Sequence, residues 1–204
     1  MFKNKTVLIT GGTGSLGKGL IKRLIGYGAT IVVYSRDEAK QAELLRKFPS
    51  IIRVIGDVRD FQQLDTTMKI HKPNFVFHTG ALKRVDDIEF YPMEGIKTNV
   101  IGSDNVARAS LLNNVDKCIL VSTDKSCQSV SAYGATKLLA ERIFTNYDYN
   151  STKTIFCSVR YGNVIASRGS FIPLFMDKMA KGETLNITDE NMSRFLFTLE
   201  DAVD

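Results

Sequence analysis

The stretch Thr6–Gly17, which reads TVLITGGTGSLG, decides the fold that this sequence predicts. Thr6–Thr10 is a short β-branched and aliphatic run, which is typical of a buried strand. Gly11, Gly14 and Gly17 follow at intervals of three, and Ser15–Gly26 continues with a helical pattern. The first glycine permits a tight turn, the second lets a pyrophosphate approach the backbone, and the third lets the helix pack closely on the sheet. This order predicts a dinucleotide-binding βα unit; the simpler interpretation is only a tight turn.

The rest of the chain repeats the alternation of strand and helix. Further strands are expected at Ala29–Tyr34, Ile51–Ile55, Phe75–His78, Cys118–Ser122 and Thr154–Arg160, and further helices at Asp37–Lys47, Phe61–His71, Glu94–Asn113 and Ser131–Tyr147. Continuous apolar strands separated by helices predict an α/β fold, a doubly wound parallel sheet (Rossmann fold) covered on both faces.

The pattern changes after Gly162, so residues 1–162 are expected to form the cofactor-binding domain with the catalytic residues. In residues 163–204 we expect a polar loop at Asn163–Ser170, a helix at Phe171–Lys181, a strand at Leu185–Ile187, and the start of a helix at Thr198–Asp204. That last helix would be cut after one turn, so this part is interpreted as the beginning of a truncated substrate-binding region.

Composition excludes several other classes of protein. The 204 residues are 44% hydrophobic and carry a net charge of +5, but no basic run that would predict a nucleic-acid partner. No apolar run approaches a membrane span and no room for a signal peptide precedes the first strand, so we expect a cytoplasmic protein. Cys118, Cys127 and Cys157 form no CxxC pair, and the two in strand-like stretches are expected to be buried. His71 and His78 do not lie in a metal-ligand pattern, so no metal site is expected.

The end of the second predicted strand bears on the choice of cofactor. Ser35 and Arg36 follow the strand directly, where an acidic residue would bind the ribose hydroxyls of NAD. An arginine suits a 2′-phosphate, with Lys40 one helical turn away, so NADP is favoured while Asp37 keeps NAD open. Arg36 could instead only pair with a surface carboxylate. Asp57, after the third strand, could bond the adenine amino group or cap the next helix.

Tyr133-Gly-Ala-Thr-Lys137 opens a predicted helix, and the four-residue spacing puts Tyr133 and Lys137 on one face. A lysine ammonium near a phenol lowers the tyrosine pKa, and the phenolate can then accept a proton from a substrate hydroxyl while a hydride leaves the same carbon. The spacing also occurs by chance, as a surface tyrosine and a surface lysine. It gains specificity here because it follows a glycine loop and a strand that ends in Val121-Ser-Thr123.

With TGGTGSLG, GDV at 56–58, YGATK at 133–137 and RYGNV at 160–164, the chain resembles the extended short-chain dehydrogenase/reductases over nearly its whole length. Thr123 matches the serine or threonine with which that family bonds the reacting oxygen. The cofactor-binding residues that the motifs and the resemblance together predict are Gly11, Thr13, Gly14, Ser15, Leu16, Gly17, Ser35, Arg36, Lys40, Asp57, Val58, Ala81, Tyr133 and Lys137.

Thr123-Asp124-Lys125 narrows the resemblance to the UDP-N-acetylglucosamine 4,6-dehydratases. Further matches are YSRDEAKQ at 34–41, ALKRV at 81–85, IKTNVIGSDNV at 96–106 and RYGNVIASRGSFIP at 160–173. The similar 4-epimerases carry no acid–base pair after the threonine. The resemblance implies oxidation at C4, removal of the C5 proton by Lys125, protonation of the departing C6 hydroxyl by Asp124, and return of the hydride to C6. The product would be a UDP-2-acetamido-2,6-dideoxy-4-hexulose.

This chemistry requires a neutral Lys125 and a protonated Asp124, whereas an ion pair shifts both pKa values the other way. We therefore expect geometry or substrate to hold the two side chains apart; the alternative is a loop ion pair of little consequence. Tyr133 is typical of the short soluble, inverting branch. The segment Ser126–Ser131 lacks the proline found in many members, which leaves the configuration at C5 open.

The resemblance also implies substrate contacts and partners. Lys83, Asn163, Arg168 and Arg194 match polar positions near the sugar or diphosphate, although each could be a solvated or turn residue. The expected partner is a UDP-sugar, and relatives assemble through helices of this domain, so a homo-oligomer is expected. A nucleotide-sugar 4-epimerase or 4-ketoreductase is the enzymatic alternative, and a non-catalytic NADP-binding module is the second.

Overall fold

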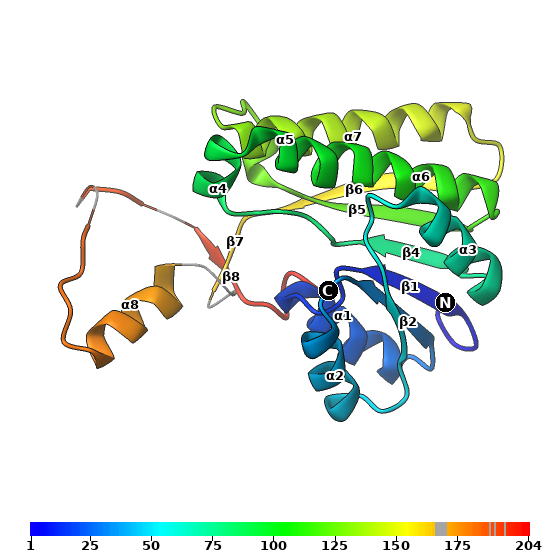
Figure 1. Cartoon of the computed structure of the whole chain (residues 1–204), viewed down its shortest axis with the longest axis horizontal. Coiled ribbons are helices and arrows are strands. Elements are labelled where there is room, and N and C mark those ends of the chain that lie inside the picture. Colours follow the sequence, from blue (N-terminus) through cyan, green and yellow to red (C-terminus); the bar gives the residue numbers. More distant parts are fainter. Residues whose placement is uncertain (166–170, 188, 190, 194) are drawn as a thin grey trace.

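A computed structural model of the chain describes residues 1–165, 171–187, 189, 191–193 and 195–204 (Figure 1). The strands of its main sheet are β1 (Thr6–Thr10), β2 (Thr30–Ser35), β3 (Ile52–Ile55), β4 (Phe75–His78), β5 (Lys117–Thr123) and β6 (Ile155–Tyr161). The helices between them are α1 (Ser15–Gly26), α2 (Glu38–Lys47), α3 (Phe61–His71), α4 (Val85–Phe90), α5 (Pro92–Gly95), α6 (Gly102–Leu112) and α7 (Ala132–Asn150).

The six strands pair in parallel in the order β3-β2-β1-β4-β5-β6, which confirms the doubly wound, Rossmann-like sheet. The chain winds outward from β1 to β3, crosses back, and then winds the other way from β4 to β6. The strand order therefore reverses between β1 and β4, where sheets of this kind bind ligands beyond the carboxyl ends of their strands.

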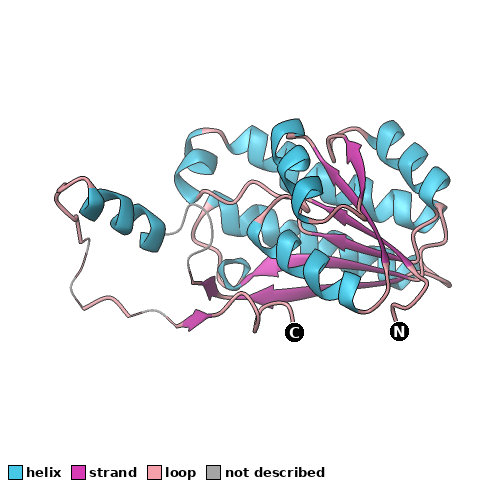
Figure 2. Cartoon of the chain, turned by 90° about the horizontal axis from the view of Figure 1, so that it is seen from below, coloured by secondary structure: helices cyan, strands magenta, loops and turns pink. Residues whose placement is uncertain are grey.

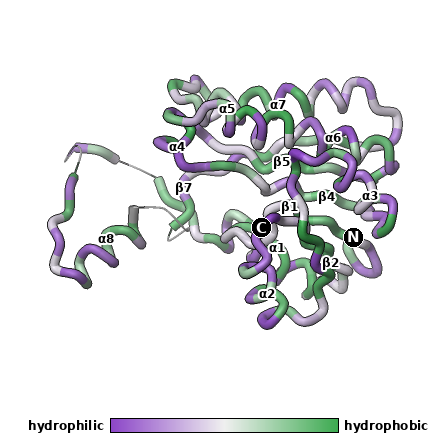
Figure 3. Tube along the Cα trace, in the orientation of Figure 1, coloured by the Kyte–Doolittle hydropathy of each residue, from purple (hydrophilic) through white to green (hydrophobic). Residues whose placement is uncertain are grey.

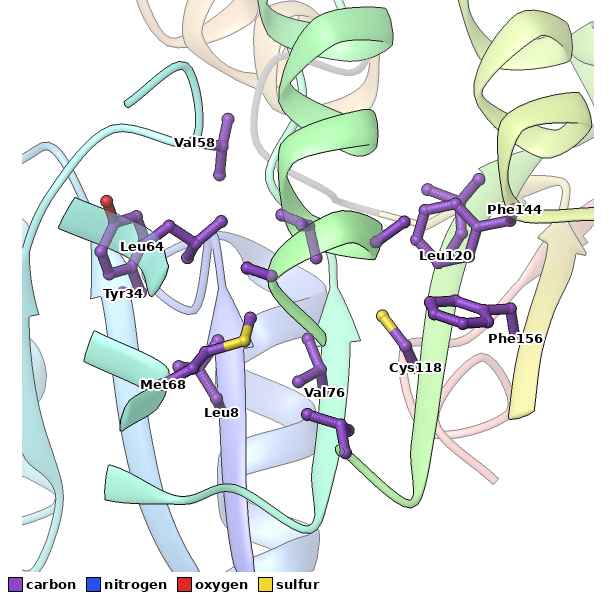
Figure 4. Packing of buried hydrophobic residues seen from close by; sticks show 14 of the residues in the cluster. Leu8, Tyr34, Val58, Leu64, Met68, Val76, Cys118, Leu120, Phe144 and Phe156 are labelled. Atoms are coloured by element: carbon purple, nitrogen blue, oxygen red, sulfur yellow. The ribbon is translucent and has the colours of Figure 1, made fainter. Parts of the chain in front are cut away.

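Alternate residues of each strand enter two separate cores, because successive side chains point to opposite faces of a sheet. On one face Leu8 and Val76 pack with the residues of α3, α6 and α7 around Phe144 (Figure 4). On the other face Ile9 and Val33 pack against α1 and α2. Residues are hydrophobic along much of the central strands and hydrophilic over many outer helical turns (Figure 3).

Most predicted elements lie within one to three residues of the observed ones, but the long helix expected at Glu94–Asn113 does not run as one α-helix. It is formed by α5, a π-helical segment at Ile96–Ile101 and α6. A π-helical segment within an α-helix is frequent at functional sites, and it carries no pattern that a period of 3.6 would reveal. The short helix α4 was not predicted.

The expectation of a sheet covered on both faces is wrong for β6. Ile155 and Val159 are half exposed, and Cys157 is exposed rather than buried. On the face where Cys157 lies, α1 and α2 cover the β1–β2 side of the sheet, and no helix of the described residues covers β6. The other face of β6 is covered by α7. Only Cys118, on the opposite face, is buried as expected.

Residues 163–204 differ in part from the prediction. Asn163–Val164 (β7) pairs in parallel with Leu196–Phe197 (β8), and α8 (Phe171–Ala180) forms as predicted, standing apart from the sheet in both views (Figures 1 and 2). The prediction of a strand at Leu185–Ile187 is wrong, since those residues form no strand in the structure. Residues 198–204 form turns rather than a helix and pack on α1, where Leu199 and Val203 contact Gly19. Of the helices that the structure describes, none has the length and apolarity that a bilayer crossing requires.

Candidate active site

A cavity of about 510 Å³ lies at the carboxyl ends of the strands, across the point where the strand order reverses. All the residues predicted to bind a cofactor line it, namely Gly11, Thr13, Gly14, Ser15, Leu16, Gly17, Ser35, Arg36, Lys40, Asp57, Val58, Ala81, Tyr133 and Lys137. Thr123 and Lys125 line the same cavity. The folding of β1, β2, β4, β5 and α7 therefore brings together segments that are more than 100 residues apart in the sequence.

The glycine loop forms one wall of this cavity. Gly11 has a φ of +68°, and a Cβ there would lie 2.6 Å from the Cα of Gly80, so the ends of β1 and β4 approach as only glycine allows. A Cβ on Gly17 would lie 2.5 Å from the Cα of Gly12, which keeps α1 close against the loop. Gly14 is the N-cap and provides no side-chain hydrogen bond. The positive end of the α1 dipole thus faces the cavity without a capping side chain.

Two cations stand at the far end of the loop, and both already have acidic partners. The Arg36 guanidinium lies 3.5 Å from a carboxylate oxygen of Asp57, and Lys40 pairs with Asp37, which caps α2. Burial alone would raise the pKa of Asp57, but hydrogen bonds from Arg59 and the charge of Arg36 outweigh it and lower that pKa. Asp57 does not cap α3, because that cap is Asp60; of the two interpretations of Asp57, the helix cap is therefore wrong.

Tyr133 and Lys137 project from the first turns of α7, which begins at its cap Ser131 and packs tightly against the preceding turn. A Cβ on Gly134 would lie 2.2 Å from the carbonyl oxygen of Lys125, so only glycine allows this approach. The Lys137 ammonium, 3% exposed as a residue, donates a hydrogen bond of 2.8 Å to the carbonyl of Val121.

The lowered tyrosine pKa that the spacing predicts is wrong for this structure. Burial raises the pKa of Tyr133 to about 12; a hydrogen bond with Thr123 opposes this shift, while the neighbouring Tyr161 and Asp124 add to it. Burial also lowers the pKa of Lys137 to about 8, although the negative charge of Glu141 works against that fall. Desolvation is therefore the largest influence on both pKa values.

Asp124 and Lys125 form the short 3₁₀ turn Asp124–Ser126 that follows β5. The Lys125 ammonium lies 3.0 Å from a carboxylate oxygen of Asp124 and 3.2 Å from the amide oxygen of Asn163. Lys125 lines the cavity, whereas Asp124 is not among the lining residues and contacts Thr123 and Lys125.

Two expectations about this pair are wrong in the structure. Geometry does not hold the side chains apart, because adjacent positions in a tight turn let them meet; separation by a bound substrate stays a prediction. The pKa of Asp124 is not raised either: burial acts to raise it, but hydrogen bonds from Lys125 and Thr123 lower it overall.

The residues predicted to bind substrate divide into two groups. Lys83 and Asn163 line the cavity, as Lys125 and Tyr161 do, and the amide oxygen of Asn163 contacts Lys125. Arg168 and Arg194 lie outside the residues that the structure describes.

Two residues of this site were not singled out in the sequence. Thr98, in the π-helical segment, lines the cavity and is 4% exposed, and its hydroxyl has no hydrogen-bond partner among the described residues. Tyr161 lines the cavity beside Tyr133, and burial raises its pKa. The motif RYGNV contains Tyr161 and the motif IKTNVIGSDNV contains Thr98, so both residues could have been proposed. That the Thr98 hydroxyl is unpaired at the cavity is visible only in the structure.

These features fit a nicotinamide dinucleotide. The glycine loop and the free end of α1 suit a pyrophosphate, and the cations at Arg36 and Lys40 lie where the adenosine end would follow. At the other end, the unpaired Thr98 hydroxyl and the buried Lys137 offer polar contacts near Tyr133.

Comparisons with known proteins agree with this arrangement. A family described as polysaccharide biosynthesis protein matches residues 7–204. Two curated relatives, the UDP-glucose 4-epimerases of Rickettsia rickettsii and Rickettsia bellii, are 45% and 44% identical over the whole chain. The chain spans 62% of the length of each.

Solved structures resemble the fold over nearly all of the chain. Pen from Bacillus thuringiensis is 38% identical with a TM-score of 0.95, covering 100% of this chain and 64% of its own. A UDP-glucose 4-epimerase of Thermotoga maritima, solved with UDP-glucose, is 22% identical with a TM-score of 0.86, covering 97% and 71%. The second likeness concerns the fold alone.

Proposed function

The chain belongs to the polysaccharide biosynthesis protein family, and on that premise we propose that it binds a nicotinamide cofactor and acts on UDP-N-acetylglucosamine as a 4,6-dehydratase. In this reaction the sugar is oxidised at C4 and then loses water across C5–C6. The observation that carries the proposal is the position of Lys125. Lys125 lines the same cavity as Tyr133 and Lys137, and its ammonium lies 3.2 Å from the amide oxygen of Asn163, which lines the cavity too.

The cofactor in this proposal is NADP. Arg36 and Lys40 supply two cations at the end of β2, and the half-exposed Arg36 can exchange its 3.5 Å contact with Asp57 for a 2′-phosphate. Held by these residues, NADP would supply the hydride acceptor for oxidation at C4 and the hydride donor for reduction at C6.

The side chains of this chain have distinct tasks in the proposed reaction. Tyr133, bonded by Thr123, takes the proton from the C4 hydroxyl. In this proposal Lys137, which lines the same cavity one helical turn along α7, stabilises the phenolate once it forms. The resulting ketone acidifies the C5 proton, which Lys125 removes. Asp124 gives a proton to the departing C6 hydroxyl, so that water leaves.

The last two steps need the Asp124–Lys125 pair to open. A hexose that enters between the carboxylate and the ammonium replaces their 3.0 Å contact and shields both groups from water. Asp124 then becomes more readily protonated, since desolvation favours the uncharged form of a carboxyl group.

Three variants test the proposal when they are mixed with NADP and UDP-N-acetylglucosamine. Lys125→Met and Asp124→Asn are expected to retain reduction of the cofactor, seen at 340 nm, and to lose the 4-keto-6-deoxy product. Tyr133→Phe is expected to lose both.

The control for these variants is Lys69→Met, which breaks a lysine–aspartate pair of 2.6 Å on α3, outside the cavity, and should keep both activities. Full product formation by Lys125→Met would contradict the proposal.

A nucleotide-sugar 4-epimerase is the second candidate, and the names of the Rickettsia relatives support it. It uses Thr123, Tyr133 and Lys137 in the same way but has no need of Lys125. Conversion of UDP-glucose to UDP-galactose that survives Lys125→Met would favour the epimerase.

We also propose that the protein assembles as a homo-oligomer. Ile101, Leu112 and Leu139 are about half exposed on the outer sides of the helical layer, where a second copy would bury them. Light scattering of the purified chain tests this, with a monomer as the contradicting result.

A further inference from the structure

One buried carboxylate connects the elements that carry the candidate catalytic residues. Tyr133, Lys137 and Glu141 follow one another at intervals of four along α7, so they share one face of that helix. Tyr133 and Lys137 line the cavity, and Glu141 lies one turn further from it, 7% exposed. The sequence analysis gives Glu141 no role, and the proposed reaction does not use it.

Glu141 contacts both ends of the turn that carries Asp124 and Lys125. The Ser122 hydroxyl donates to Oε1 of Glu141 at 2.5 Å, and the Ser126 hydroxyl lies 2.7 Å from the same oxygen. Ser122 immediately precedes Thr123, and Ser126 immediately follows Lys125. The Ser126 hydroxyl is also 2.7 Å from the carbonyl oxygen of Thr123, so the turn is closed on itself and on α7 at one point.

The same carboxylate holds the end of β6. Arg160 donates to Glu141 through Nε at 2.9 Å and through Nη2 at 2.5 Å, in a two-point arrangement that fixes the relative orientation of both groups. Arg160 directly precedes Tyr161, and Asn163, which bonds Lys125, follows two residues later. Glu141 therefore contacts residues next to two segments of the cavity wall, the Thr123–Lys125 turn and the end of β6.

A surface ion pair would hold nothing in place, because solvent competes for both partners. Here the carboxylate is enclosed while the guanidinium is about half exposed. Ser122 and the two Arg160 nitrogens donate to its oxygens, and the Ser126 hydroxyl shares its single proton between Glu141 and the Thr123 carbonyl. Burial alone would raise the pKa of Glu141, but Arg160 and the two serines lower it to about 2, so the group stays charged. A buried charge with this many partners resists displacement, since moving one partner leaves it unsatisfied.

We propose that Glu141 is a positioning residue that sets the distance of the Thr123–Lys125 turn and of the β6 end from Tyr133 and Lys137. Its effect on turnover rests on the proposed function, whereas its effect on the order of the turn does not.

The test combines two readouts on the 204-residue chain. Hydrogen–deuterium exchange without substrate reports the order of residues 122–127, in which the Cys127 amide bonds the carbonyl of Asp124 at 3.0 Å. The hydride returns to the sugar in each cycle, so reduction of NADP by UDP-N-acetylglucosamine is followed as a single turnover in stopped flow. It reports the rate constant and the half-saturating sugar concentration of a step that dehydratases and epimerases share.

Glu141→Gln keeps the shape and removes the charge, and Ser126→Ala removes one contact while leaving the Glu141–Arg160 pair intact. Both variants are expected to exchange about tenfold faster across 122–127. The rate constant for NADP reduction should fall about tenfold in both variants. The half-saturating sugar concentration should stay within about twofold of the wild type, because the groups proposed to bind the substrate remain.

The matched control is Asp65→Asn, which also alters a carboxylate with two side-chain partners, Lys69 and Asn113, at the α3–α6 contact outside the cavity. It should leave exchange at 122–127 and both kinetic constants unchanged.

Wild-type exchange across 122–127 in both Glu141→Gln and Ser126→Ala would overturn the inference. A fall in the rate constant for NADP reduction that Asp65→Asn shares equally would also overturn it, because the fall would then reflect general destabilisation of the fold. Failure of the dehydratase proposal would appear separately, as absence of the 4-keto-6-deoxy product in the wild type.

Discussion

Titration of Lys137 should make the stability of this chain depend on pH in a way that a single variant can isolate. The ammonium is 3% exposed, and burial lowers its pKa from 10.5 to about 8. Since one pKa unit corresponds to about 1.4 kcal/mol, the charged form is destabilised in the folded state by about 3 kcal/mol.

The sign follows from which state holds the proton. Below pH 8 both states are protonated, and the folded state bears the whole penalty. Between pH 8 and 10.5 the unfolded chain still binds a proton that the folded chain has released, so stability rises with pH. Above the unfolded pKa the penalty is gone.

Lys137→Met removes this titration. Urea unfolding of wild type and variant at pH values from 7 to 11 should show the difference in unfolding free energy, wild type minus variant, increasing by about 3 kcal/mol. The lost hydrogen bond to Val121 adds a constant offset, so the change with pH is diagnostic. A Lys137→Met difference that does not change between pH 7 and 11 would refute the reasoning.

Three further outcomes follow from the geometry of the cavity. Gly17→Ala places a methyl group 2.5 Å from Gly12 and should weaken cofactor binding at least about tenfold by calorimetry, while Gly26→Ala, with nothing within 4 Å, should leave it unchanged. Arg36→Ala should weaken NADPH binding about tenfold without affecting NADH, because only NADPH carries the 2′-phosphate; equal losses would contradict the NADP assignment. Tyr133→Phe should bind NADPH as the wild type does and give no reduction of NADP; measurable reduction would exclude the phenol as the base.

The fold and the cofactor end of the site were predictable because both depend on local patterns. The glycine spacing after Thr6–Thr10, and short apolar strands alternating with helices, leave few arrangements other than a doubly wound sheet. In that sheet Gly11 and Arg36 follow the carboxyl ends of β1 and β2, and Tyr133 begins the helix that follows β5. All three are therefore expected at the same edge of the sheet, and they do line one cavity.

What the sequence could not give depends on contacts between distant segments and on burial. The spacing of Tyr133 and Lys137 suggests mutual stabilisation, but desolvation, which no motif reports, raises one pKa and lowers the other. The exposure of Cys157 depends on which helices cover β6, and the role inferred for Glu141 depends on Ser122 and Arg160, 19 residues away on either side.

The most direct measurement is NMR of the product formed from UDP-N-acetylglucosamine and NADP in deuterated water. If Lys125 and Asp124 act on the same sugar as Tyr133, the product is a 4-keto-6-deoxy sugar with one solvent deuteron at C5, because the C5 proton is removed and replaced. A C4 epimer with no deuterium at C5 would contradict the dehydratase mechanism.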